Sequence, residues 1–288
     1  MTTNPSPLLS APRIGLGCWR LAGPGRPPRP VALATIAAAY EAGARVFDTA
    51  DSYGIDQEDE GYGEAILAEA LAGVDDAAVI TKGGFRRPGG VWEHAGDPSW
   101  LAKAVEASIE RLGRGPLDCY LLHGVDPRFD VAASIEPIAA AQEAGLIKSI
   151  GVSNVSAAEL ARCRAVAPVT VVQNRLSVTL RPAGWRAVFD IAAGDGLTYM
   201  PHTPFGPTPE VPDERLLPWN NPAVTKIAAE HQVTAAVVAL AWLLGLGRNV
   251  LVVPGARRPE SIVDSLRAPS FKLSEAEFAE LSQLPAAQ

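Results

Sequence analysis

The sequence predicts a single α/β domain, folded as a closed (β/α)8 barrel of the TIM type. The chain has 288 residues, a length that suits one such barrel with modest insertions. Short apolar runs alternate along it with segments of helical periodicity. No linker or repeat divides the chain, so we expect one domain over residues 1–288.

Eight short β-branched or apolar runs are the predicted strands. Several lack strict alternation of apolar and polar residues, which is typical of parallel strands buried on both faces. Their number favours a closed barrel over an open sheet. The runs are Arg13–Trp19, Arg45–Ala50, Ala78–Lys82, Asp118–His123, Ile147–Asn154, Val169–Ser177, Leu197–Pro201 and Val250–Pro254.

Helical segments separate these runs, and several of them stop at a glycine. Parallel neighbouring strands need a crossover connection, so this alternation predicts a parallel α/β fold. Glycine is the usual residue just after a helix, because it adopts the left-handed conformation at little cost. The clearest examples are Val31–Ala42 before Gly43, Pro98–Leu112 before Gly113 and Val131–Ala144 before Gly145.

Two longer connections interrupt the regular pattern. Between the last two predicted strands lie a Pro-rich loop, Pro204–Pro218, and the helical segments Asn221–His231 and Thr234–Leu246. We therefore expect an extra helix before the last strand, and a C-terminal helix at Ser274–Leu284. The segment Gly83–Asp97 is a second insertion, rich in Gly, Pro and Arg.

Charge and cysteine content narrow the classes of partner and compartment. The net charge of −7 offers no basic field that would recruit nucleic acid. Three distant cysteines, Cys18, Cys119 and Cys163, make neither a disulfide framework nor a CxxC metal motif. We expect a small-molecule partner and a reducing, cytoplasmic location.

Neither export nor membrane insertion is expected. The first residues have no basic region followed by an apolar core, as a signal peptide would. The most apolar stretch, Val233–Leu246, is shorter than the ~20 residues that a membrane-spanning helix needs. A buried barrel helix explains this stretch better, and we expect a monomer or a weak homo-oligomer.

Polar residues end five of the predicted strands. The carboxyl ends of barrel strands form the active face, so these side chains are expected to converge on one site. The histidines outside this set lack metal-ligand spacing, and we expect no metal. The five strand-end residues are Asp48, Lys82, His123, Asn154 and Gln173.

Six motifs in order give the sequence a family resemblance: FDTADSYG, ITKGG, LLHG, GVSN, VVQN and VVPGARRPE. Together they resemble the aldo-keto reductase superfamily over nearly the whole chain. The resemblance implies an oxidoreductase that uses NADPH to reduce an aldehyde or ketone. The segments RPGG-x-W, SIERLG and VVQNRLS are similar to a bacterial branch that includes pyridoxal reductases.

The resemblance implies a catalytic tetrad of Asp48, Tyr53, Lys82 and His123. Tyr53 would give a proton to the carbonyl oxygen. We expect the ammonium of Lys82 to lower the pKa of Tyr53, and Asp48 to pair with that ammonium. A neutral His123 would orient the substrate oxygen. The alternatives are a turn cap at Asp48, a packed loop ring at Tyr53, a solvated strand end at Lys82 and a core histidine at His123.

The resemblance also implies contacts to the nicotinamide and diphosphate. Ser153, Asn154 and Gln173 match positions that bind the carboxamide, and strand-end capping is their other interpretation. Leu176 stands where the family often has a stacking aromatic ring, so aliphatic packing would have to replace it. The expected diphosphate loop supplies Pro201, His202, Thr203, Phe205 and Gly206.

A last set of implied contacts follows the final strand, around the adenosine 2′-phosphate. Because a guanidinium can bind phosphate in a bidentate manner, Arg257 and Arg258 favour NADPH over NADH. A solvated basic loop is the alternative for this pair. Trp19 and Trp92 are expected to contact substrate, or else to pack in the core or on the surface. The full expected set near the 2′-phosphate is Gly255, Arg257, Arg258, Ser261 and Ser265.

Two other functions stay open at this point. Leu176 and His202 are unusual for the family and suggest a biosynthetic dehydrogenase, an epimerase or an imine reductase on the same scaffold. A non-catalytic, nicotinamide-binding subunit is the other alternative, and the intact tetrad argues against it. Sequence does not identify the substrate or the physiological direction.

Overall fold

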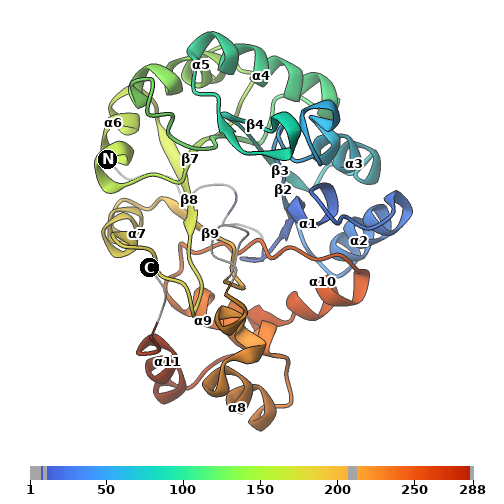
Figure 1. Ribbon diagram of the computed structural model, residues 1–288, viewed down its shortest axis with the longest axis vertical. Helices are drawn as coiled ribbons and strands as arrows, with labels where there is room; N and C mark the ends of the chain where they lie inside the picture. Colours follow the sequence, from blue (N-terminus) through green and yellow to red (C-terminus); the bar gives the residue numbers. More distant parts are fainter. Residues whose placement is uncertain (1–7, 9–11, 207–212, 286–288) are drawn as a thin grey trace.

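A computed structural model describes residue 8, residues 12–206 and residues 213–285 (Figure 1). The middle of the expected Pro-rich loop, residues 207–212, lies outside the described part of the chain.

Seven parallel strands form one curved sheet, and each pairs with the next one along the chain. All seven coincide with predicted runs, but most are shorter than the prediction. The strands are β1 (Leu16–Gly17), β2 (Val46–Asp48), β3 (Ala78–Gly83), β6 (Cys119–Leu122), β7 (Ile150–Ser153), β8 (Val169–Arg175) and β9 (Thr198–His202).

The eighth predicted run, Val250–Pro254, is not a regular strand but still closes the barrel. Val250 forms a parallel bridge to Tyr199 of β9, and Val252 forms one to Ile14, which precedes β1. The Leu251 N–H donates to the Tyr199 carbonyl at 3.0 Å. The predicted (β/α)8 barrel is therefore correct, with an irregular eighth segment.

A ring of helices covers the outside of the sheet (Figure 1). Two features keep α4 within the bounds that the sequence predicts: the Asp97 carboxylate caps its first turn, and Gly113 ends it at φ 59°. The ring helices are α2 (Arg29–Glu41), α3 (Tyr62–Ala70), α4 (Pro98–Leu112), α5 (Val131–Glu143), α6 (Ala157–Val166), α7 (Trp185–Gly194), α9 (Ala235–Gly245) and α10 (Pro259–Ser265).

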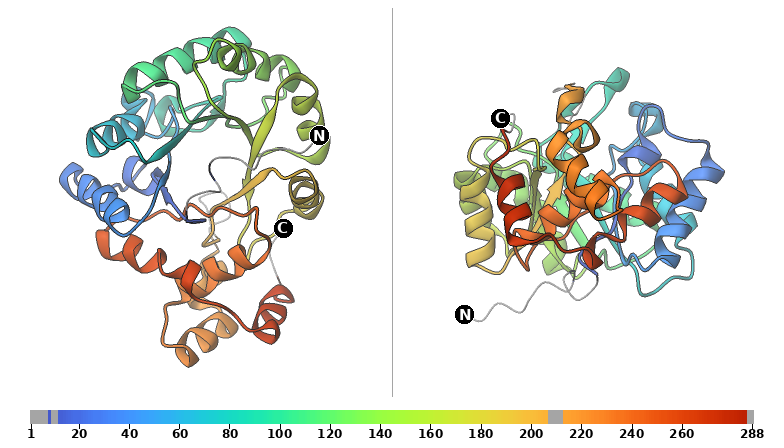
Figure 2. Two further views of the ribbon diagram at one scale, coloured as in Figure 1. Left: turned by 180° about the vertical axis from the view of Figure 1, so that it is seen from behind. Right: turned by 90° about the horizontal axis from the view of Figure 1, so that it is seen from below.

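The expected extra helix and C-terminal helix are both present. They are α8 (Pro222–Glu230) and α11 (Glu275–Ser282), which pack side by side outside the ring (Figures 1 and 2). Among the described residues no single helix is long and apolar enough to cross a membrane. The pair α8 and α9 reaches that length only with a bend of 100°.

Short elements fill the connections between these helices and strands. The insertion Gly83–Asp97 forms an antiparallel hairpin in which Phe85 pairs with His94. The short elements are α1 (Trp19–Ala22), β4 (Phe85–Arg86), β5 (Glu93–His94) and the 3₁₀ turns η2 (Gln57–Asp59), η3 (Pro88–Gly90), η4 (Glu214–Leu216), η5 (Pro218–Asn220) and η6 (Ala268–Ser270).

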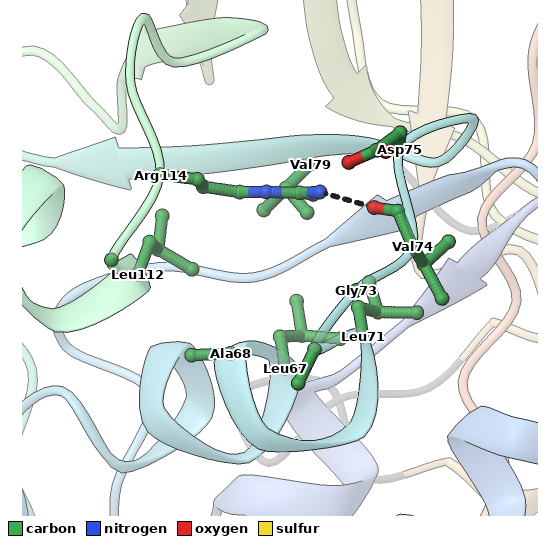
Figure 3. Close-up of a pocket in the computed structure, with 11 residues that line it drawn as sticks. Leu67, Ala68, Leu71, Gly73, Val74, Asp75, Val79, Leu112 and Arg114 are labelled. Carbon is green, nitrogen blue, oxygen red and sulfur yellow. Dashed lines mark hydrogen bonds between the residues drawn. The ribbon is translucent and has the colours of Figure 1, made fainter.

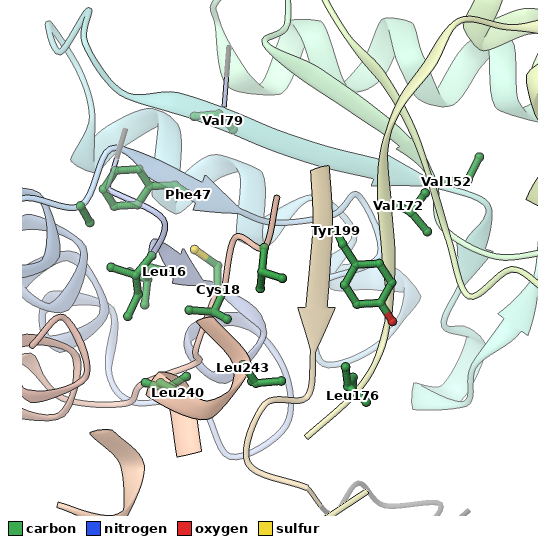
Figure 4. Packing of buried hydrophobic residues seen from close by; sticks show 14 of the residues in the cluster. Leu16, Cys18, Phe47, Val79, Val152, Val172, Leu176, Tyr199, Leu240 and Leu243 are labelled. Carbon is green, nitrogen blue, oxygen red and sulfur yellow. The ribbon is translucent and has the colours of Figure 1, made fainter. Parts of the chain in front are cut away.

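Successive residues of most strands belong to different parts of the core. Val46, Ile80, Leu121, Val171 and Met200 form one small cluster, together with Leu251 and Val253 of the eighth segment, among others. Their chain neighbours join a larger cluster with the helices, part of which Figure 4 shows. Because side chains alternate across a strand, the small cluster fills the barrel and the large one lies between barrel and helices.

Candidate active site

The polar strand-end residues meet at one end of the barrel. Asp48 ends β2, Lys82 lies next to the end of β3, His123 follows β6 and Ser153 ends β7. Parallel pairing places Asp48 opposite Ile80 and Lys82 opposite Leu121, so these carboxyl ends lie on the same side. The predicted convergence on one face is correct.

Lys82 is the centre of this cluster. Its side chain has no exposed surface. Its ammonium lies 2.9 Å from Asp48 Oδ2, 2.5 Å from the Thr49 carbonyl oxygen and 3.3 Å from Tyr53 Oη. An ammonium has three N–H donors, and each has an oxygen partner here. Lys82 thus links the end of β2 to the loop that carries Tyr53.

The second oxygen of Asp48 has its own partner. Gln173 Nε2 donates to Asp48 Oδ1 at 2.9 Å, and both side chains are buried. Gln173 is expected to bind the nicotinamide carboxamide, and one of the two N–H groups of its side-chain amide is already bonded to Asp48.

The pKa of Tyr53 differs from the sequence-based expectation. Burial raises it to about 12, while the nearby Lys82 ammonium opposes that rise. The expected net lowering of the Tyr53 pKa is therefore wrong, because desolvation of the phenolate outweighs the attraction. For Lys82, burial lowers the pKa, but the charges of Asp48 and Tyr53 raise it above the usual value overall.

His123 is buried beside Tyr53. The two rings meet edge to face with centroids 5.7 Å apart. Burial and the positive charge of Lys82 hold the pKa of His123 well below its usual range, so the imidazole is neutral at pH 7. Its Nδ1 atom is buried and has no hydrogen-bond partner in the described part of the chain.

A chain of hydrogen bonds continues from His123 along the barrel rim. Asn154 Nδ2 donates to the His123 carbonyl at 2.9 Å and to Ser153 Oγ at 3.1 Å. The side-chain oxygen Oδ1 of Asn154 lies 2.8 Å from His202 Nε2, and His202 Nδ1 lies 2.8 Å from Thr203 Oγ1. Asn154 and Thr203 both have a positive φ, of 56° and 57°, which is unusual for residues other than glycine.

His202 therefore lies against the expected carboxamide-binding residues, rather than only in a diphosphate loop. Burial, with the charges of Arg175 and Lys82, lowers its pKa to about 3, so it too is neutral at pH 7. Beyond it along the loop, Phe205 contacts Trp219 with ring centroids 5.9 Å apart. Pro201 is buried in β9, and Gly206 has φ 95°.

Two residues expected to contact the cofactor are buried. Leu176 has no exposed surface and packs in the core between barrel and helices (Figure 4). The Ser265 hydroxyl donates to the Ser261 carbonyl at 3.0 Å inside α10. Ser153 is buried to the same extent, so burial does not distinguish these residues, and their cofactor contacts stay predictions.

Arg257 has a cationic neighbour that sequence reasoning missed. Partial desolvation of its side chain and the positive charge of Arg257 lower the pKa of Arg20, and the stem of Arg20 lies against Gly255. Arg257, Arg258 and Arg20 are exposed and form no ion pair with any described residue. Like charges held together without an acid are suited to a phosphate. The position of Arg20 directly after Trp19 was the available signal.

An aromatic cluster borders the tetrad. Trp19 lies 5.2 Å from Tyr53 and 5.2 Å from Trp92, and Trp92 lies 6.0 Å from His123, each measured between ring centroids. Both predicted tryptophans are thus brought to the site. Phe85 of β4, which sequence reasoning missed, contacts Trp92 at 5.5 Å and His123 at 5.1 Å. These rings are partly exposed.

The described part of the chain has a second cavity, away from the tetrad, but no metal-binding cluster. It contains no group of three or more His, Cys, Asp or Glu side chains that could hold a metal ion. A pocket of about 440 Å³ lies at the opposite end of β3 from Lys82, between α3 and the end of α4 (Figure 3). There Arg114 donates to the Val74 carbonyl at 2.7 Å.

Comparison with known proteins agrees with this geometry. Residues 13–285 match the model of the Aldo/keto reductase family. Pyridoxine 4-dehydrogenase of Escherichia coli is 33% identical over 278 residues, which cover 92% of each chain. An uncharacterized oxidoreductase of Schizosaccharomyces pombe is 28% identical over 276 residues, 94% of this chain and 86% of its own length.

A solved structure shows the same fold. An aldo-keto reductase from Klebsiella pneumoniae, crystallised in complex with NADPH, superimposes with a TM-score of 0.79. It is 24% identical and the match covers 96% of this chain and 92% of that one. With the barrel, the Asp48–Lys82–Tyr53 contacts and the family match in agreement, this chain belongs to the aldo/keto reductase family.

Proposed function

We propose that the protein is an NADPH-dependent reductase of aldehydes or ketones, with Tyr53 as the general acid. One observation carries the proposal: Tyr53 Oη lies 3.3 Å from a buried ammonium, Lys82, which is itself paired with Asp48 at 2.9 Å. A phenol needs such a neighbour if it is to act as an acid. Residues 1–288 would form one catalytic domain.

Tyr53 performs the proton transfer in this proposal. Bound NADPH supplies the hydride that the carbonyl carbon receives. The O–H bond of Tyr53 breaks and its proton passes to the carbonyl oxygen, which completes an alcohol. The phenol is fully protonated at neutral pH, because its pKa is about 12. The phenolate that remains is a weaker base than an alkoxide, and the Lys82 ammonium stabilises it.

His123 orients the substrate. A neutral imidazole carries one N–H donor, which can hold the carbonyl oxygen near Tyr53 without competing as an acid. The low pKa of His123 keeps this donor neutral across the physiological range. The edge-to-face contact with Tyr53 keeps the two groups side by side.

The residues present fit a dinucleotide phosphate. Ser153, Asn154 and His202 would hold the nicotinamide end, and Arg257, Arg258 and Arg20 the 2′-phosphate. The proximity of Arg20 and Arg257, with no acidic partner among the described residues, supports this second assignment. Gln173 would contribute its Oε1 and its second amide N–H, because the first N–H is bonded to Asp48.

The substrate class follows from the rings around the tetrad. Trp19, Trp92 and Phe85 would contact the substrate and favour a small aromatic or heteroaromatic aldehyde. Because the Escherichia coli relative is a pyridoxine 4-dehydrogenase, pyridoxal is the first compound to test. We also infer a cytoplasmic location, supported by three buried, unpaired cysteines, and a monomer or weak homo-oligomer.

Replacing Tyr53 by Phe tests the mechanism directly. We expect Tyr53→Phe to lower kcat for aldehyde reduction by about 10²–10⁴-fold, the usual contribution of a general acid, with nearly unchanged NADPH binding. Stopped-flow NADPH oxidation and fluorescence titration of NADPH measure the two quantities. Retention of wild-type kcat in Tyr53→Phe would refute the role of Tyr53. Wild-type protein that binds NADPH but turns over no aldehyde would instead favour the imine reductase or epimerase alternative.

The cofactor assignment has a separate test. Replacing both Arg257 and Arg258 by Met removes bidentate phosphate donors, so the Kd for NADPH should rise by about tenfold or more while the Kd for NADH changes little. Isothermal titration with each cofactor measures both constants. A parallel loss for NADPH and NADH would contradict a contact with the 2′-phosphate.

A further inference from the structure

Arg87 is a buried cation that the proposed reaction does not use. It lies in the hairpin insertion directly after β4, and only 5% of its surface is exposed. It makes no ion pair with any described residue. A charge this deeply buried carries a desolvation cost, and burial lowers the pKa of Arg87 accordingly.

Two backbone carbonyls and two aromatic rings surround the Arg87 guanidinium. Nη1 donates to the Gly54 carbonyl at 3.0 Å, and Nη2 donates to the Gly90 carbonyl. The central carbon lies 4.9 Å from the Trp19 ring and 4.7 Å from the Trp92 ring. Both distances are within the range of cation–π attraction.

These contacts join three separate segments at the site. Trp19 follows β1, Gly54 directly follows the proton donor Tyr53, and Trp92 belongs to the hairpin insertion. The backbone N–H of Arg87 also donates to Gln57 Oε1 at 3.1 Å, and Gln57 belongs to the same loop as Tyr53. Arg87 is therefore the common partner of the loop that holds Tyr53 and of both tryptophans.

We propose that Arg87 is a positioning residue that holds Trp19 and Trp92 as the binding wall for a flat aromatic aldehyde. The proposal rests on the function proposed above, and it assigns the preference of the enzyme for aromatic over aliphatic aldehydes to Arg87. A direct contact between Arg87 and an anionic substrate is not part of it, because only 5% of the residue is exposed. Both terminal nitrogens donate to carbonyl oxygens, and the buried Nε has no hydrogen-bond partner among the described residues. The fixed rings offer flat faces to an aromatic aldehyde, whereas a small aliphatic aldehyde needs little from them.

The chain offers a matched control. Arg86 is the preceding residue of the same hairpin, but it is exposed and its guanidinium lies over Trp100 at 4.5 Å. Its Nε donates to Gln57 Oε1 at 3.2 Å, so it shares the Gln57 contact with Arg87 but not the contacts with Gly54, Trp19 and Trp92. Arg87→Met and Arg86→Met thus remove the same charge and keep a similar side-chain length. Arg87→Lys keeps the charge but cannot reach two carbonyls as a planar fork does.

The experiment compares benzaldehyde with propanal, using NADPH in excess. For Arg87→Met we expect kcat/KM with benzaldehyde to fall about 10- to 100-fold, mainly through KM, as displaced positioning groups do. The propanal value should fall less, through any shift of the loop that carries Tyr53, so the ratio of the benzaldehyde to the propanal kcat/KM should fall about tenfold or more. In Arg86→Met this ratio should change by about twofold or less. Arg87→Lys should show the same selective loss, and it replaces Arg87→Met if that variant does not fold.

A second measurement does not depend on turnover. With NADP⁺ bound, the binding of benzyl alcohol is followed by the quenching of tryptophan fluorescence. The affinity for benzyl alcohol should fall in Arg87→Met and not in Arg86→Met. An equal loss for both aldehydes, or unchanged selectivity, would overturn the role of Arg87 and leave the proposed function intact. Wild-type protein that reduces neither aldehyde would count against the proposed function, and benzyl alcohol binding would still test Arg87.

Discussion

Lys82 keeps its charge at a position without solvent because three oxygen atoms surround its ammonium. Removing one member of a buried ion pair usually costs several kcal/mol, so Asp48 and Lys82 stabilise the fold in addition to their proposed role in proton transfer. Asp51, close by in the chain, has the opposite character. Its carboxylate is buried, and neither oxygen has a hydrogen-bond partner among the described residues.

Asp51 makes the stability of the protein depend on pH. Burial, together with the negative charges of Glu64 and Glu60, raises its pKa well above the usual value. A group with a raised pKa in the folded state contributes stability that is complete below the unfolded-state pKa, near 3.9, and is lost as the pH rises toward the folded-state value. We therefore expect Asp51→Asn to become more stable relative to wild type as the pH is raised from 4 to 8.

Urea unfolding at each pH measures this difference. Asp190→Asn removes an exposed carboxylate and controls for the loss of one negative charge. A constant difference between Asp51→Asn and wild type over the whole range would mean that Asp51 is ionised in the folded protein.

At the scale of elements, local signals decide how well the sequence predicts a boundary. The bounds of α4 match the prediction, since Asp97, Pro98 and Gly113 define both of its ends within the chain itself. The first predicted strand is reduced to Leu16–Gly17, because Trp19 begins a short helix that turns toward Tyr53. The predicted run Val250–Pro254 depends for its conformation on two strands far away in the sequence.

At the scale of the whole molecule, the barrel is closed by isolated bridges between β1 and the irregular eighth segment, here called the seam. The same contacts position part of the site. Gly17 N–H donates to the Pro254 carbonyl at 3.0 Å, and Gly17 pairs with Asp48 on its other side. The bridge from Gly17 to Gly255 brings the segment with Arg257 beside the one with Trp19 and Arg20. Closure of the barrel therefore places the segment before Arg257 beside β1, on the face that carries Asp48.

Gly17→Ala tests this seam. A Cβ atom at Gly17 would lie 2.7 Å from the Val253 carbonyl oxygen, closer than real Cβ contacts, so the two segments must separate. We expect a loss of about 1–3 kcal/mol in the free energy of unfolding, the usual cost of overpacking, with weaker NADPH binding.

Gly194→Ala is the control for Gly17→Ala. Its Cβ would meet no atom within 4 Å, and it lies in α7, where alanine is the better residue. Equal unfolding energies for Gly17→Ala and wild type would show that the seam is not tightly packed.

The sequence by itself determined the barrel and the common face of Asp48, Lys82, His123 and Asn154. The reason is physical: parallel strands of one barrel end on one side, so polar residues at consecutive strand ends must converge. The order of the six motifs along the chain was enough to predict the family.

Only the tertiary structure decided which partner each side chain has. Gln173 bonds to Asp48, Leu176 is buried, Arg20 lies beside Arg257, and Arg87 joins the loops of Tyr53 and Trp92. Burial also raises the pKa of Tyr53 above the value that its charged neighbour suggested. These features depend on desolvation and on contacts between loops distant in the chain, which no local pattern encodes.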